Sequence, residues 1–158
     1  MPDDIMKFMT NGWLDISIIT WFSMTCFTYQ KRLTTPKRCV FLNPNRISQG
    51  ICSEGPEEVT AYIKKIMTQD RDKYYILPYH QLNHWSLFII YPSKKYGYIL
   101  DSLKGTKVAQ DYLLSGLVDE AIGRCLWDLP PCQQQRSGWE CGYYVMKWIH
   151  RFILYEQH

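Results

Sequence analysis

Apolar residues recur along this chain with two different periods. A helical period, with an apolar residue at every third or fourth position, marks segments near the two ends of the chain, whereas short aromatic and β-branched stretches separated by turn residues mark its middle. The pattern predicts an α+β arrangement, with strands in the middle and helices outside them. The predicted helices begin at Asn11 or Asp15, at 55 and at 141, and the predicted strands are 73–80, 84–92 and 96–103.

Weaker patterns predict the remaining elements. Residues 37–48 contain a short apolar piece broken by Asn-Pro-Asn, which indicates a strand or a loop, and residues 109–122 predict a further helix. Residues 125–129 predict a strand or a loop that runs into two prolines. No repeat, low-complexity tract or linker is visible, so we expect residues 1–158 to form a single domain.

The composition is that of a folded globular domain, with 46% hydrophobic and 21% charged residues. The net charge of +3 is too small to indicate the concentrated basic face of a nucleic-acid-binding protein, so we expect no nucleic-acid partner. The longest apolar run, from Trp13 to Phe27, is interrupted by Asp15 and several hydroxyl side chains. It is too polar to span a bilayer and predicts a buried helix, so we expect no membrane partner.

The six cysteines occur at irregular spacings without a Cys-x-x-Cys pair, which indicates neither a zinc cage nor a redox motif. The amino-terminal residues lack the basic region and continuous apolar segment of a secretory signal. We therefore expect free thiols, no metal or other cofactor, and an intracellular, reducing location, in the nucleus or the cytoplasm.

Cys141 is the candidate nucleophile because it lies where a Gly-Trp-Glu loop turns into the last predicted helix. The positive end of a helix dipole favours a thiolate, but a neighbouring imidazole lowers the pKa of a thiol much more. Of the four histidines, His150 lies nine residues into the same helix and His158 ends the chain, so neither reaches Cys141. His80 and His84 have the spacing of a zinc pair, but that pair needs a helix, and the following strand argues against one.

His84 is either a histidine that caps a turn or a catalytic base, and Asp101 favours the second interpretation. If residues 84–92 and 96–103 are neighbouring strands, their hairpin brings the start of the first beside the end of the second. A carboxylate in that place would orient the imidazole, as in a Cys-His-Asp triad. The three glutamines before the Gly-Trp-Glu loop are either a polar loop or the source of an oxyanion donor, with the backbone N–H of Cys141 as a second donor.

These motifs together resemble the ubiquitin-like-protein proteases, the Ulp or sentrin/SUMO-specific cysteine proteases. "HWSL" followed 17 residues later by the Asp of "LDS" resembles the family's strand pair, and "QRSGWECG" resembles its Gln-x-Asn-Gly-x-Asp-Cys-Gly signature. "GWLDISIITWF" resembles its amino-terminal Trp-Leu-Asn-Asp helix. The resemblance extends from Trp13 to the last helix, and the "WECGYYVMKW" form is similar to that of plant members.

The resemblance implies a papain-like fold of the Ulp type, in which a mixed or antiparallel sheet is flanked by helices and the nucleophile begins the carboxy-terminal helix. It implies His84 as base, Asp101 as the residue that orients it, Cys141 as nucleophile and Gln135 as oxyanion donor. It also implies that Trp13 and Trp85 line a narrow tunnel for the modifier's Gly-Gly tail, substrate-binding roles that would alternatively be core packing.

The chain departs from the family pattern in three places. The family's Trp-Leu-Asn-Asp-Glu is Trp-Leu-Asp-Ile-Ser here, so acidic groups that can face a basic modifier surface are missing or shifted. Glu140 replaces the usual aspartate before the nucleophile. The interval from Asp101 to Cys141 is short for a SUMO protease, which predicts a trimmed peripheral element.

The resemblance implies a cysteine peptidase that cleaves after the carboxy-terminal Gly-Gly of a ubiquitin-like modifier, with SUMO as the first expectation. The expected partners are this modifier and its conjugates, and we expect the protein to act as a monomer. Three alternatives stay open: a protease for a Rub-type modifier or ubiquitin, a catalytically weak domain that binds a modifier, and acyl transfer to a protein by a related cysteine fold.

Overall fold

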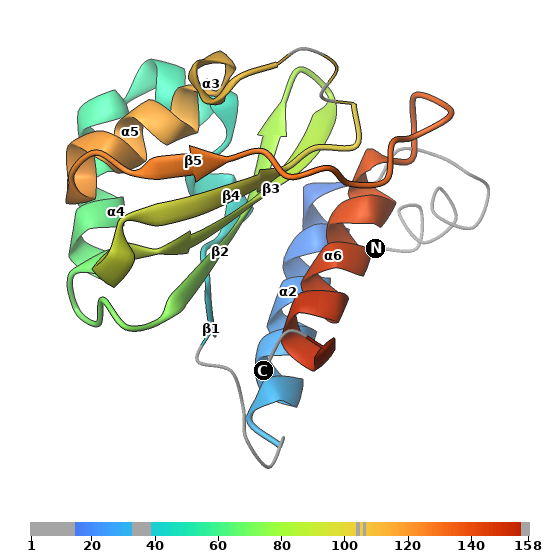
Figure 1. Cartoon of the computed structure of the whole chain (residues 1–158), viewed down its shortest axis with the longest axis horizontal. Helices are drawn as coiled ribbons and strands as arrows, with labels where there is room; N and C mark the ends of the chain where they lie inside the picture. The colour runs from blue at the N-terminus through green and yellow to red at the C-terminus, as the bar shows by residue number, and fades with distance from the viewer. Residues whose placement is uncertain (1–14, 33–38, 104, 106, 156–158) are drawn as a thin grey trace.

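The centre of the computed structural model (Figure 1) is a mixed five-stranded sheet in the order β1-β2-β3-β4-β5. The inner pairs, β2 with β3 and β3 with β4, are antiparallel, and the two outer pairs are parallel. The structure describes residues 15–32, 39–103, 105 and 107–155. The strands are β1 Cys39–Phe41, β2 Tyr74–Gln81, β3 His84–Tyr91, β4 Tyr96–Leu100 and β5 Leu126–Asp128.

Helices cover both faces of this sheet. Figure 1 shows α4 and α5 on one face, and α2 and α6 lying side by side on the other. Among the described residues, no helix has the length and hydropathy that a membrane crossing requires. The helices are α2 Ile16–Gln30, α3 Gln49–Glu54, α4 Pro56–Met67, α5 Leu113–Ile122 and α6 Cys141–Tyr155, with short 3-10 turns η1 Pro44–Arg46, η2 Pro92–Lys94 and η3 Ala109–Asp111.

The predicted helices and strands are confirmed, with three corrections, of which the first is that β4 ends at Leu100 and not at the predicted 103. Helix α2 follows Asp15, whose side chain accepts a hydrogen bond from the Ser17 N–H at 2.8 Å, and α4 begins with Pro56. Helix α3 was not predicted. It has only six residues and contains Gly50, a poor helix former, so the sequence shows no helical period there. Helix α5 begins at Leu113, later than the predicted 109, because residues 109–111 form η3 first.

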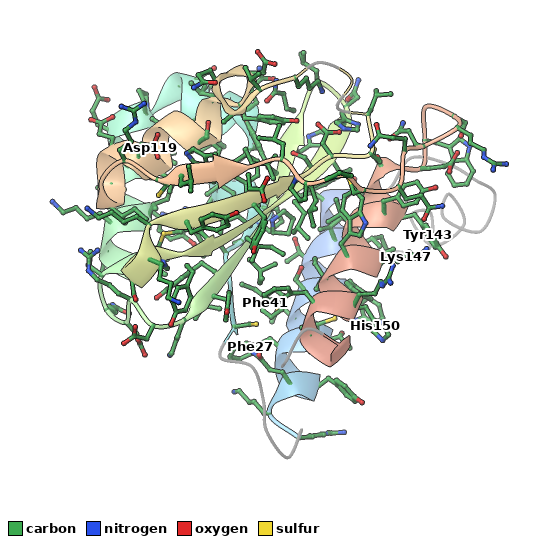
Figure 2. All side chains as sticks on the ribbon, in the orientation of Figure 1. Phe27, Phe41, Asp119, Tyr143, Lys147 and His150 are labelled. Atoms are coloured by element: carbon green, nitrogen blue, oxygen red, sulfur yellow. The ribbon has the colours of Figure 1, made fainter. Side chains whose placement is uncertain are left out.

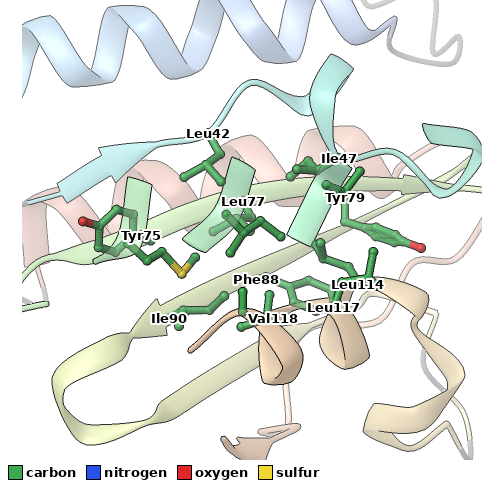
Figure 3. Close-up of a cluster of buried hydrophobic side chains, with 14 of the residues drawn as sticks. Leu42, Ile47, Tyr75, Leu77, Tyr79, Phe88, Ile90, Leu114, Leu117 and Val118 are labelled. Atoms are coloured by element: carbon green, nitrogen blue, oxygen red, sulfur yellow. The ribbon is translucent and has the colours of Figure 1, made fainter. Parts of the chain in front are cut away.

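Strands β2 and β3 are buried on both faces, so their alternate residues enter two separate hydrophobic cores. Figure 3 shows the first, the α4/α5 core, where side chains of β2 and β3 pack against Leu114, Leu117 and Val118 of α5. The second is the α2/α6 core, and it includes Trp85, Ile149 and Cys141. The candidate nucleophile therefore belongs to one core, and the other core has no predicted site residue.

A two-residue turn joins β2 to β3. Leu82 and Asn83 both have positive φ angles, 50° and 57°, which is the backbone conformation of the tight hairpin turns that match the twist of a sheet. Gln81 is thereby paired with His84, and the pairing continues without a break to Tyr75 and Ile90. The turn fixes the register in which β3 begins with His84.

Candidate active site

The β3–β4 hairpin brings His84 and Asp101 together. His84 is the first residue of β3, and Asp101 follows the last residue of β4, whose Leu100 is paired with Leu87. His84 Nε2 and Asp101 Oδ1 are 2.5 Å apart. The neighbourhood that the hairpin predicted is confirmed.

The Asp101 carboxylate is fully buried and accepts hydrogen bonds at both oxygens. Besides His84, Oδ1 accepts the Leu103 backbone N–H at 2.8 Å, and Oδ2 accepts the Tyr112 hydroxyl at 2.5 Å and Lys107 Nζ at 3.4 Å. Burial alone would raise the pKa of Asp101, but the hydrogen bonds from His84 and Tyr112 hold it well below its usual range. Asp101 is therefore an ionised carboxylate at neutral pH.

His84 lies between this carboxylate and the thiol of Cys141. Burial by itself lowers the pKa of His84, but hydrogen bonds with Asp101 and Cys141, together with their negative charges, raise it to about 9. Cys141 is the first residue of α6 and is 1% exposed. At neutral pH a charged imidazole therefore lies near the sulfur of Cys141, at the amino terminus of α6.

The loop before α6 is anchored to Ser102, the residue next to Asp101. The Gln135 backbone N–H donates to the Ser102 carbonyl at 2.8 Å, and the Ser102 hydroxyl donates to Gln135 Oε1 at 2.6 Å. Gln135 Nε2 donates to the Ser137 carbonyl at 2.7 Å. Because a carbonyl can only accept, the amide orientation is fixed, and one N–H of Nε2 is left for another acceptor. The role of Gln135 as oxyanion donor stays a prediction.

Glu140 stabilises the loop directly before Cys141 through hydrogen bonds to Arg136 and Ser137. Its carboxylate accepts the Ser137 hydroxyl at 2.8 Å, the Ser137 N–H at 2.9 Å and the Arg136 N–H at 3.2 Å. The hydrogen bond from the Ser137 hydroxyl is the largest cause of the lowered pKa of Glu140. The carboxylate thus fixes the path by which the chain enters α6 at Cys141.

The two predicted tunnel tryptophans have different outcomes. Trp13 lies outside the described residues. Trp85 is 2% exposed and belongs to the α2/α6 core with Cys141. The centroids of the Trp85 and His80 rings are 4.7 Å apart. Its assignment to a substrate tunnel stays a prediction.

Neither His80 nor His150 takes the place of His84, and His158 lies outside the described residues. His80 contacts Trp85, and burial and the charge of His84 lower its pKa. His150 is exposed on the outer side of α6, where Figure 2 shows it beside Lys147 and away from the sheet. Among the described residues, no group of three or more His, Cys, Asp or Glu side chains could hold a metal ion. The described cysteines are free thiols, as predicted.

Sequence reasoning missed most of the groups around Asp101. Gln134 Nε2 and the Cys132 thiol both donate to the Asp101 carbonyl, at 3.0 and 3.4 Å. Ser102 could have been found, because it follows Asp101 directly in the "LDS" motif. Tyr112 and Lys107 carry no local signal, since only the folded loop after β4 brings them to the carboxylate.

A separate cleft of about 390 Å³ lies between α6 and β4. It is bordered by Tyr98, Trp148 and Arg151 and by the segment 130–133. None of the predicted site residues lines it. The reactive groups are therefore at a different place from this cleft.

Comparison with protein families decides the class of this site. A model of the Ulp1 protease family, C-terminal catalytic domain, matches residues 23–158. The chain belongs to the Ulp1 protease family. This confirms the family recognised from the motifs and its class, the cysteine peptidases. A comparison with curated protein sequences found no significant match.

Solved structures of Ulp1-type proteases share the fold. A de-sumoylating protease is 18% identical, with a TM-score of 0.65 over 90% of this chain and 62% of its own. The C-terminal Ulp1 protease domain in complex with Smt3, the yeast ortholog of SUMO, is 23% identical, with a TM-score of 0.63 over 89% and 66%. The Xanthomonas campestris effector XopD bound to ubiquitin is 21% identical, with a TM-score of 0.65 over 88% and 75%. The chain thus has the Ulp-type α+β fold and spans less than two thirds of the first two.

Proposed function

We propose that this chain is a thiol protease or isopeptidase that hydrolyses the bond after the carboxy-terminal Gly-Gly of a ubiquitin-like modifier, with SUMO as the first candidate. The observation that carries the proposal is the buried His84–Asp101 pair, 2.5 Å apart, with Cys141 at the start of α6 near enough to His84 to help raise its pKa. A thiol alone would be only a few per cent ionised at neutral pH, whereas a thiol paired with an imidazole is a strong nucleophile.

In the proposed reaction, the Cys141 thiolate attacks the carbonyl carbon of the last glycine. The oxyanion that forms accepts hydrogen bonds from the Cys141 backbone N–H, which has no partner within the helix, and from the remaining N–H of Gln135. The His84 imidazolium gives its proton to the leaving amine, and the C–N bond breaks to leave a thioester. His84 then takes a proton from water, which attacks the thioester; the C–S bond breaks to regenerate the Cys141 thiolate, and the modifier's new carboxyl group loses its proton to solvent.

Asp101 orients His84 throughout and stabilises its charged form. The carboxylate stays ionised because four donors bind it. The proton given to the leaving amine is therefore the imidazole's own. Cys141 therefore supplies the nucleophile, and His84 supplies the general acid.

Two observations support a ubiquitin-like modifier as the substrate. The family match covers most of the chain, and among structures of the same fold one Ulp1 protease domain is in complex with Smt3 and one effector is bound to ubiquitin. Asp15, which stands where the family's acidic helix begins, caps α2 through its bond with the Ser17 N–H. This altered start of α2 makes ubiquitin or a Rub-type protein the second candidate modifier.

A panel of modifier probes that carry a carboxy-terminal vinyl sulfone tests the proposal. We expect the SUMO probe to label the protein covalently, and Cys141→Ala to abolish the labelling. Cys52→Ala is the matched control, because Cys52 is equally buried but far from His84 in the other core, and it should keep the labelling. If no probe labels the wild-type protein, the proposal is wrong. Stoichiometric binding without labelling would instead support a modifier-binding domain.

A further inference from the structure

The second oxygen of Asp101 is bound by groups outside the predicted triad. The geometry points to Tyr112 as a positioning residue that holds the Asp101 carboxylate in the orientation in which it binds His84. This inference rests on the proposed function, since it concerns the same site. It adds a fifth side chain, from the start of α5, to a mechanism otherwise built from the start of β3, the end of β4, the loop before α6 and the start of α6.

Tyr112 is itself firmly held. Its hydroxyl lies 2.5 Å from Asp101 Oδ2, and the residue is 3% exposed. Its ring meets the Phe88 ring edge-on, with centroids 5.6 Å apart and an angle of 82° between the planes. Both belong to the α4/α5 core. A phenol clamped by a packed core presents its hydroxyl at a fixed point, with little entropy lost when the hydrogen bond forms.

The Asp101 carboxylate needs such a fixed point, because it lies beyond the end of β4 and the bond to its carboxylate carbon rotates over a broad range. The other donors do not provide it. His84 and the Leu103 N–H both bind Oδ1, and Lys107 reaches Oδ2 only at 3.4 Å from a side chain that is 36% exposed. Tyr112 is the short, buried contact to Oδ2, so it sets the plane of the carboxylate.

The alternative is that the Tyr112 hydroxyl only satisfies a buried carboxylate. In that case its loss would lower stability and leave catalysis unchanged. Burial and the negative charge of Asp101 raise the pKa of Tyr112 well above its usual range, so the phenol keeps its proton and donates at every working pH. Its removal therefore changes a hydrogen bond and no charge, which makes the two roles separable.

The first test is Tyr112→Phe, which keeps the ring in the core and removes one oxygen. We expect kcat to fall about tenfold and KM to stay within about twofold, because a misplaced triad member slows the chemical step. Tyr96→Phe is the matched control: it also removes a tyrosine–carboxylate bond, to Asp128 at 3.0 Å, but at the other end of β4. It should leave kcat unchanged. Equal kcat in Tyr112→Phe and the wild type would overturn the inference.

The second test needs no substrate, so it holds even if no modifier probe reacts. The pKa of His84 is measured by NMR in protein with labelled histidine, and His84→Asn assigns the signal. A carboxylate free to rotate binds the imidazole less well, so Tyr112→Phe should lower the pKa of His84. If the pKa of His84 is unchanged in Tyr112→Phe, the role of Tyr112 is structural only. If the pKa of His84 rises, the Tyr112 hydroxyl only weakens the negative charge of Asp101 and does not position it, and the inference is wrong. Among the described residues, the ionisable groups near His84 are His80, Asp101 and Cys141. Lys107 and Tyr112 bind the Asp101 carboxylate, and the Cys132 thiol contacts the Asp101 backbone carbonyl.

A third measurement uses the unmodified chain, in case Tyr112→Phe does not fold. The ¹³Cζ resonance of Tyr112 reports its hydrogen bond to Asp101, so it should shift with the same midpoint as the titration of His84. A resonance that does not move as His84 titrates would contradict the coupling. Absence of probe labelling together with a normal coupling would reject the proposed function alone.

Discussion

Each face of the sheet buries a cysteine almost completely, and the two thiols differ in their neighbours. Cys52 lies in the α4/α5 core and Cys141 in the α2/α6 core, and each is 1% exposed. The Cys52 thiol donates a hydrogen bond to the Ile47 carbonyl at 3.3 Å, and burial raises the pKa of Cys52 to about 11. Cys141, in contrast, lies close enough to His84 to help raise the pKa of that imidazole. Burial alone makes a thiol unreactive, whereas a charged partner in a fixed position beside it makes a buried thiol reactive.

The largest expected effect is the loss of activity in Cys141→Ala, compared with Cys52→Ala. Cys141→Ala should lower kcat/KM for a fluorogenic modifier substrate by roughly 10⁴-fold or more, because nothing else can form the thioester. Cys52→Ala should leave kcat/KM within about twofold and reduce the free energy of unfolding by about 1 to 2 kcal/mol. Loss of activity in both variants, with both still folded, would contradict the assignment of one reactive and one silent thiol.

The second prediction removes the charge that supports His84. Asp101→Asn keeps the shape of the side chain and should lower kcat/KM by roughly 10²- to 10⁴-fold, because the imidazole loses its orientation and its charge support. Circular dichroism and thermal unfolding should show that the variant still folds cooperatively. In this variant the Cys141 thiol should be as unreactive as the Cys52 thiol. Full activity would remove Asp101 from the mechanism.

The third prediction concerns pH. His84 has a pKa raised from 6.5 to about 9, so its contribution to stability is fully present below about pH 6.5 and is lost as the pH rises through 9. At about 1.4 kcal/mol for each pKa unit, the contribution is about 3 kcal/mol. Urea unfolding between pH 6.5 and 9 should show the decrease, and kcat/KM should fall above about pH 9 as the imidazolium loses its proton. His84→Asn is the control and should lack the decrease.

The smallest effect is expected at the loop before Cys141. Glu140→Gln keeps an acceptor for the Ser137 and Arg136 groups but loses the charge that strengthens those hydrogen bonds. We expect kcat/KM to fall about three- to tenfold, since the loop positions the thiol without touching the substrate. Glu57→Gln, on the exposed first turn of α4, is the matched control and should have no effect. A loss of more than about 100-fold would mean that Glu140 takes part in the chemistry.

The sequence predicted the elements and residues whose signal is local or depends on a hairpin. The strand patterns of β3 and β4 placed Asp101 beside His84, because an antiparallel hairpin fixes which residues meet. The amino-terminal position of Cys141 in α6 followed from the helical period that starts there. Helix α3 escaped prediction, because six residues that include a glycine have no detectable period.

The groups that complete the site could not be predicted, because they depend on how loops return to the sheet. Tyr112 reads in sequence as an apolar residue near a helix start, and only the path of residues 101–112 brings its hydroxyl to Asp101. Gln135 was recognised by its spacing to Cys141, but its hydrogen bond with Ser102 depends on the packing of two segments that are 33 residues apart. Long-range contacts of polar side chains leave no period in a sequence.

The tight Leu82-Asn83 turn limits how this region can change in length. A single residue inserted there would shift β3 by one position against β2, and every side chain of the strand would change faces. His84 would then point away from Asp101, and the core residues of β3 would exchange sides as well. A change of length at this tip that shifts the register of β3 would abolish the site without altering any of its residues, so the register that this turn sets is as much a part of the active site as the histidine that follows it.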